Sequence, residues 1–89
     1  MDDNPPDALD SVRRVKADHE AEILAKPNVI GVGVGLVRRA GRSTAQIGII
    51  VMVERKVPGA ELAPAQRVPA EIEGVRVDVQ EVGEVRAHD

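Results

Sequence analysis

The sequence predicts an α+β domain in which an N-terminal helix packs on a small, mainly antiparallel sheet of three strands. Three patterns indicate this helix-strand-strand-strand order: apolar residues at three- and four-residue steps before Pro27, two largely apolar runs after it, and a strictly alternating run near the C-terminus. The 89 residues suffice for one such domain. We expect it to span residues 5–83, with a disordered N-terminus over 1–4 and a frayed tail over 84–89.

The first element is a helix expected at residues 5–25. Asn4 suits the N-cap and Pro5 the first helical position, and Pro27 ends the helix because a residue before proline avoids helical geometry. One face carries an apolar stripe made of Leu9, Val12, Val15, His19 and Ile23. An amphipathic helix of this kind buries its stripe against another element, here the sheet.

Strands are expected at residues 29–38 and 46–56, joined by the polar segment RRAGRSTA, which suits a hairpin loop. The second run is apolar on both faces, which favours a central strand. Residues 57–71 contain three prolines and a glycine and read as a connection. In the third strand, residues 73–82, valines alternate with polar residues, so one of its faces is expected to meet solvent.

Composition limits the function classes. The chain contains no Phe, Tyr, Trp or Cys, so its core is aliphatic and it has neither a disulfide nor a thiolate metal site. A small core of this kind gains stability by burying surface against another copy or another domain. The acidic start, MDDNPPDALD, does not resemble a secretory signal, which favours a cytoplasmic location. No segment approaches the ~18 apolar residues that predict a membrane span.

Charge is unevenly distributed along the chain. Residues 27–56 carry five bases and one acid, whereas residues 1–26 and residues 57–89 carry seven acids each. Patches of opposite sign can steer copies of one molecule together. Ordinary solvated surface charge is the other interpretation.

Three glycines alternate in the first strand, so Gly31, Gly33 and Gly35 share one of its faces. A phosphate cradle is excluded by context, because the run lies between two strands and opens no helix. Close packing against the bare backbone is a second interpretation, with the helix residues Val12 and Val15, or a partner, lying on the glycines. A loosely specified strand with variable register is the third. These five residues form the interface predicted from the sequence.

The sequence contains few candidate catalytic residues. His19 lies on the apolar stripe and is expected to be a partly buried packing residue, while His88 lies in the tail. Ser43 and Thr44 read as turn residues. The His19 region does not complete an H-E-x-x-H motif, because residue 23 is isoleucine. The sequence therefore predicts no enzyme, no metal and no cofactor.

Basic residues gather near the predicted hairpin: Arg38, Arg39 and Arg42 in the loop, and Arg55 and Lys56 at the end of the second strand. Nucleic-acid binding usually adds aromatic stacking residues or a strongly basic domain. This chain has neither, so the arginines are interpreted as a solubilising turn.

An ordered set of motifs resembles a known family. The segments KPNVIGVGVG, IGIIVMVERKVP and VPAEIEGVRVDVQEVG, together covering about residues 24–87, resemble a short N-terminal segment of certain bacterial trypsin-like serine peptidase homologues. In that family the segment precedes the peptidase domain. The resemblance implies an accessory domain without its enzyme, and it carries over no catalytic residue.

Two functions follow as hypotheses. The first is a non-enzymatic structural or scaffold protein that self-associates into a homo-oligomer or a filament, by strand addition or by docking of a helix on another copy. The alternative is an interaction or regulatory module for a separately encoded serine peptidase or another protein partner.

Overall fold

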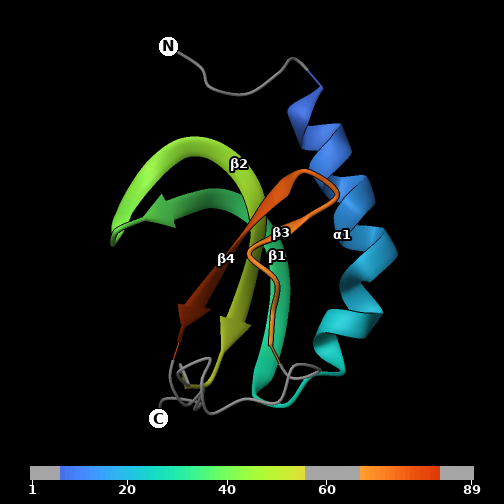
Figure 1. Cartoon of the computed structure of the whole chain (residues 1–89), viewed down its shortest axis with the longest axis vertical. Helices are drawn as coiled ribbons and strands as arrows, with labels where there is room; N and C mark the ends of the chain where they lie inside the picture. The colour runs from blue at the N-terminus through green and yellow to red at the C-terminus, as the bar shows by residue number, and fades with distance from the viewer. Residues whose placement is uncertain (1–6, 56–66, 83–89) are drawn as a thin grey trace, which may run out of the picture.

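The computed structural model describes residues 7–55 and 67–82, and it confirms the α+β class. One helix covers one face of a single four-stranded sheet (Figure 1). The elements are α1 Ala8–Leu24, β1 Val29–Arg39, β2 Arg42–Val53, β3 Glu71–Ile72 and β4 Val75–Glu81. The termini predicted to be disordered or frayed, residues 1–4 and 84–89, lie outside the described residues.

The strands follow the spatial order β1-β2-β4-β3, so β2 is central, as predicted. β1 and β2 pair antiparallel, β2 and β4 pair parallel, and β4 and β3 pair antiparallel. The prediction of three strands is therefore wrong in number. Two of the three pairings are antiparallel, as a mainly antiparallel sheet requires, but the β2–β4 pairing is parallel, so the sheet is mixed. β1 and β4 cover the two edges of β2, in keeping with its largely apolar sequence.

Both hairpins turn on two residues. Ala40 and Gly41 have φ values of 52° and 80°, and Glu73 and Gly74 have φ values of 50° and 81°. Two successive positive φ values are typical of the type I′ turn, whose twist matches that of the flanking strands. The predicted loop RRAGRSTA thus belongs mostly to β1 and β2, and the predicted third strand begins with a turn.

The helix begins at Ala8 among the described residues, with Asp7 at the N-cap; Asn4 and Pro5 lie outside them. The buried helix residues are Ala8, Val12, Val15 and Ile23. Leu9 was expected on the buried stripe, but it is exposed. The prediction is wrong at this position because Ala8 occupies the buried face in the first turn.

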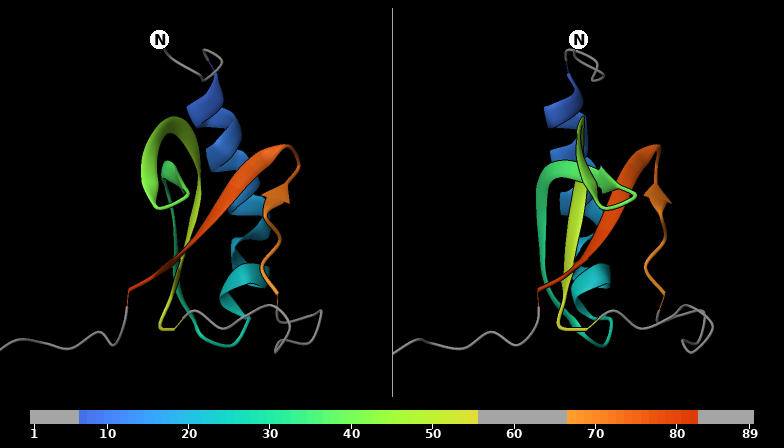
Figure 2. Two further views of the ribbon diagram at one scale, coloured as in Figure 1. Left: turned by 60° about the vertical axis from the view of Figure 1, so that its left-hand side comes forward. Right: turned by 90° about the vertical axis from the view of Figure 1, so that its left-hand side faces the viewer.

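The core lies between α1 and one face of the sheet, and among the described residues it is wholly aliphatic (Figure 2). Its buried members are Val12, Val15 and Ile23 of α1, Ile49, Val51 and Val53 of β2, and Val75 and Val77 of β4. The side chains of β2 and β4 alternate, so every second residue of these strands contacts the helix layer. The remaining strand residues form the opposite face.

Candidate protein interface

The outer edge of β1 is the longest open edge of the sheet. In the described part of the chain β1 pairs only with β2, and it lies at one side when the sheet is seen face on with α1 behind it (Figure 2, right). Residues 29–37 of this strand include no charged residue and no proline. Ile30 and Leu36 are 45% and 52% exposed. Edge strands commonly carry charges or proline that discourage pairing, and this stretch has neither.

The glycines of β1 face away from the helix. Gly31 lies opposite Met52 and Gly33 opposite Ile50, whereas Val32 and Val34 lie opposite Val51 and Ile49 of the core face. The predicted packing of the helix on the glycines is therefore wrong. α1 packs on the valine face, where larger apolar side chains give more buried area than bare backbone.

The five residues predicted as an interface are thus not brought together. Val12 and Val15 are buried in the core between α1 and the sheet. Gly31, Gly33 and Gly35 lie on the far face, where Met52 and Ile50 are their neighbours in β2. Val12 and Val15 contribute to the fold, and the glycines keep the role of candidate interface residues.

Little of the backbone over these glycines is tightly covered by the chain itself. A methyl group placed on Gly33 would come no closer than 4.0 Å to the Met52 Cε atom. On Gly35 it would lie 3.2 Å from Ile50 Cγ1, and on Gly31 2.7 Å from the flexible tip of Met52. Close approach within the chain therefore explains Gly33 least of the three.

The tight contact lies instead at Gly48 of β2. A methyl group there would lie 2.5 Å from the carbonyl oxygen of Arg76 and 2.5 Å from Val37 Cγ1. Val37 is itself buried. This contact at Gly48 was not predicted from the sequence, although an isolated glycine inside an apolar strand is a known sign of close backbone approach.

The end of the β1–β2 hairpin bends over the glycine face and is tied to β4 (Figure 1). The Arg38 amide donates to Asp78 Oδ2 at 2.8 Å, and Arg38 Nε lies 3.6 Å from the same oxygen. Gln80 Nε2 also donates to Asp78 Oδ2, at 2.9 Å. Arg38, expected to be a solvated loop residue, is therefore part of the contact that holds this bend.

Other polar residues of the hairpin form hydrogen bonds with the backbone or with one another. Thr44 lies in β2, not in a loop, and its Oγ1 donates to the Val37 carbonyl at 2.7 Å. Arg39 Nη2 donates to Gln46 Oε1 at 3.4 Å. At the open end, the Arg55 amide donates to Asn28 Oδ1 at 3.0 Å. Ser43 and Arg42 are exposed strand residues, and Lys56 and His88 lie outside the described residues.

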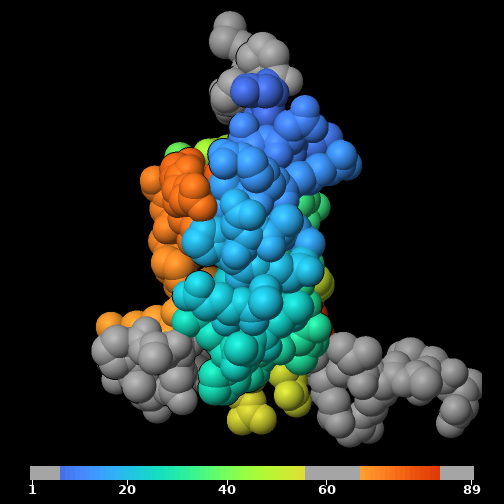
Figure 3. Space-filling view, turned by 90° about the vertical axis from the view of Figure 1, so that its right-hand side faces the viewer, coloured from blue at the N-terminus to red at the C-terminus, as the bar shows by residue number. Residues whose placement is uncertain are grey.

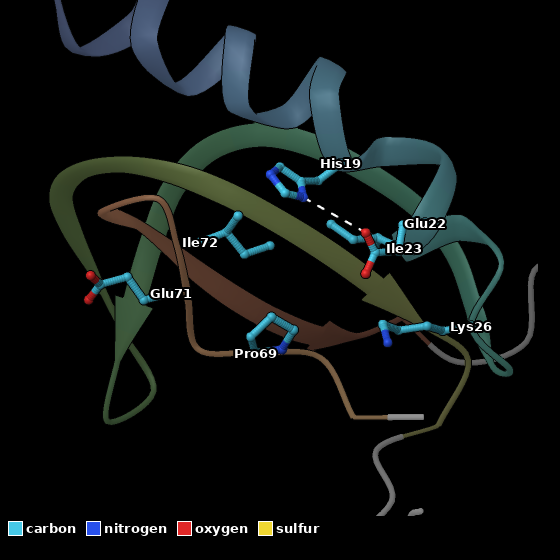
Figure 4. Close-up of a pocket in the computed structure, with 7 residues that line it drawn as sticks. All are labelled: His19, Glu22, Ile23, Lys26, Pro69, Glu71 and Ile72. Atoms are coloured by element: carbon cyan, nitrogen blue, oxygen red, sulfur yellow. Dashed lines mark ion pairs between the residues drawn. The ribbon is translucent and has the colours of Figure 1, made fainter. Parts of the chain in front are cut away.

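A pocket of about 240 Å³ separates the C-terminal half of α1 from the segment that enters β3 (Figure 4). Its lining consists of His19, Glu22, Ile23, Lys26, Pro69, Glu71 and Ile72. His19 Nε2 lies 2.7 Å from Glu73 Oε2, and His19 Nδ1 lies 3.9 Å from Glu22 Oε2. The histidine thus links α1 to the β3–β4 turn, a structural contact in keeping with its predicted partial burial.

The lining of this pocket includes no hydroxyl or thiol that His19 could activate. In the part of the chain that the structure describes, no three His, Asp or Glu side chains are grouped so as to hold a metal ion. Glu73 is 54 residues from His19, so no sequence spacing could have indicated this pair.

Within residues 7–55 and 67–82, no helix is long and apolar enough to cross a membrane. No protein-family model matches the chain, and a search of curated proteins also finds no match. The resemblance to segments that precede bacterial serine peptidase domains therefore stays a prediction.

Proposed function

We propose that this protein is a non-enzymatic module that associates with copies of itself through the outer edge of β1. The observation that carries this proposal is the uncharged, proline-free stretch of residues 29–37, which presents its outer backbone groups for pairing. Strand addition at such an edge derives its affinity from main-chain hydrogen bonds. It needs no aromatic anchor, which suits a chain without aromatic residues.

The exposed side chains support the same edge. Ile30 and Leu36 are two of the five large hydrophobic residues exposed among the described residues, and they flank the glycine run. Pairing of a second strand would remove apolar surface at both ends of the run from water. The glycines between them place no side chain in the way of an approaching strand.

Size-exclusion chromatography with light scattering, over about a thousandfold range of concentration, tests self-association. We expect a mass above 9.5 kDa that falls on dilution, with negative-stain images separating discrete oligomers from filaments. A mass of 9.5 kDa at every concentration would contradict the proposal.

Amide hydrogen exchange followed by NMR then locates the contact. Alternate amides of β1 point away from β2, and we expect their exchange to slow as the concentration rises. The amides of α1 serve as the internal control, because their partners lie within the helix. Slowing confined to another element would place the contact elsewhere.

The alternative, a module for a separately encoded peptidase or another protein, uses the same edge with a different strand. A monomer of constant mass that captures one partner from native extract, and loses it when the β1 edge is altered, would favour this alternative.

A further inference from the structure

The edge of β1 is palindromic in residue type around Gly33. Moving outward from this glycine, the sequence meets Val32 and Val34, then Gly31 and Gly35, and then Ile30 and Leu36. Val29 and Val37 continue the series in sequence, although the register of β1 with β2 shifts at both of these ends. Two copies related by a two-fold axis must present the same patch to each other, so residue i meets residue j and j meets i. A palindromic edge meets this condition, because each residue then lies opposite a residue of similar type in the second copy.

We infer that two copies pair antiparallel through β1, with the two-fold axis beside Gly33; this inference rests on the proposed self-association. In this register Gly33 faces its own copy, and Ile30 of each chain lies opposite Leu36 of the other. These are the two exposed large hydrophobic residues of β1. Directly opposed apolar side chains stabilise a strand pair, and this register provides that contact twice.

The charges of α1 fit the same arrangement. α1 runs antiparallel to β1 on the face that Figure 3 shows, so the two-fold axis places the two helices on one face in opposite directions. The first half of the helix carries three bases, Arg13, Arg14 and Lys16, against one acid, Asp10, and the second half carries the acids Asp18, Glu20 and Glu22. The basic half of each helix therefore lies beside the acidic half of the other, which favours association with a second copy over an uncharged peptide.

Distances permit this pairing. α1 packs over both β1 and β2. With strands about 4.8 Å apart, a helix centred above these two strands lies about 10 Å from its symmetry copy. Helices pack at about 8–10 Å, so the two helices would meet without overlapping.

The other edge of the sheet explains why the assembly stops at two chains. There β3 pairs with only Val75 and Arg76 of β4, and the rest of β4 carries the charged residues Asp78 and Glu81, which discourage pairing with a further strand. The eight strands of a pair would form one continuous sheet with a short strand at each end. We therefore infer a closed dimer, not a filament.

A charge-complementation experiment on the full chain tests the register. Ile30→Lys and Leu36→Glu are made separately, each at an exposed position of β1. We expect each variant alone to dimerise at least tenfold more weakly, because it places a charge opposite an apolar side chain at two sites per dimer. Val82→Lys, at a residue also 45% exposed but beyond the end of β4, is the matched control and keeps the parent affinity.

Mixing the two variants restores one Ile–Leu pair and creates one Lys–Glu pair in the proposed register. We expect the mixture to form heterodimers of twice the 9.5 kDa mass under conditions where each variant alone is monomeric. The double variant Ile30→Lys/Leu36→Glu regains homodimers for the same reason. Circular dichroism melting curves show that each variant is folded.

The outcomes separate the two proposals. A parent protein that is monomeric throughout overturns the proposed function and the dimer with it. A parent that associates while both single variants associate equally well leaves self-association in place and overturns the β1 register. Loss of association in the single variants without recovery in the mixture also overturns the register, and filaments of the parent protein overturn the closed dimer.

Discussion

Gly33 of β1 and Gly48 of β2 lie on the same face of the sheet, yet their surroundings differ. A methyl group on Gly48 would lie 2.5 Å from a backbone carbonyl oxygen of β4. On Gly33 it would meet a single side-chain atom at 4.0 Å. Both glycines interrupt apolar strands, so the residues around them do not indicate which of the two is tightly packed. Strand glycine therefore has two uses here: close backbone contact at Gly48, and at Gly33 a half-buried position with room for a side chain.

The difference follows from the position of each strand. Gly48 lies in the central strand, between β1 and β4, where the bent hairpin brings Val37 onto the backbone. Gly33 lies in the edge strand, where the described part of the chain provides a neighbouring strand on one side only.

Gly48→Ala should have the largest effect. We expect a loss of about 3 kcal/mol in the free energy of unfolding, because the backbone of β4 cannot move away as a flexible side chain can. Urea denaturation followed by circular dichroism measures it. Unchanged stability would show that β2 and β4 are farther apart than described.

A double-mutant cycle identifies the neighbour responsible. Val37→Ala removes one of the two atoms that crowd Gly48 and costs about 2 kcal/mol alone, because Val37 is buried. In the double variant we expect about 1 kcal/mol of recovery, since the clash with the Arg76 carbonyl remains. If the losses of the two single variants simply add, the clash with the Arg76 carbonyl alone accounts for the destabilisation by Gly48→Ala.

Asp78→Ala should have an intermediate effect. The carboxylate accepts hydrogen bonds from the Arg38 amide and from Gln80, so its removal should cost about 1.5 kcal/mol and free the end of the hairpin. Asp78→Asn keeps an acceptor oxygen and should lose less. Amide exchange at Arg38 should accelerate more in the alanine variant, and equal effects of the two variants would argue against the hydrogen bond.

Gly33→Ala should have the smallest effect, and of opposite sign. The position has room and no positive φ, so we expect a gain of about 0.5 kcal/mol from the lower entropy of the unfolded chain. Gly41→Ala is the control: nothing crowds that site, but its φ of 80° opposes a side chain, so stability should fall. A loss at Gly33 measured at fixed protein concentration would show that something covers this glycine.

Local patterns predicted much of the fold. The helix, the two long strands, the central place of β2 and the core valines of β4 all follow from periodicity, because each pattern reflects which face is buried. The turns were less apparent: Ala40–Gly41 and Glu73–Gly74 lack the Asn-Gly or Asp-Gly signature of a type I′ turn.

The errors concern contacts between distant segments. Periodicity shows that β1 has two different faces but not which of them α1 covers. Of the two occupants proposed for the glycine face, the helix is wrong. The parallel pairing of β2 with β4, and the pairs Arg38–Asp78 and His19–Glu73, join residues far apart in the chain. No spacing in one sequence specifies such pairs, so the candidate interface depends on the topology.

The parallel pairing of β2 with β4 also has a consequence for the order of folding. α1, β1 and β2 are contiguous, and the β1–β2 hairpin closes over a two-residue turn, a step that takes microseconds. The pairing of Ile49 with Val77 is not local, so we expect it to form more slowly than the hairpin. A chain in which β4 has not yet docked would expose one edge of its most apolar strand, so aggregation during refolding should depend on how quickly the C-terminal strand docks.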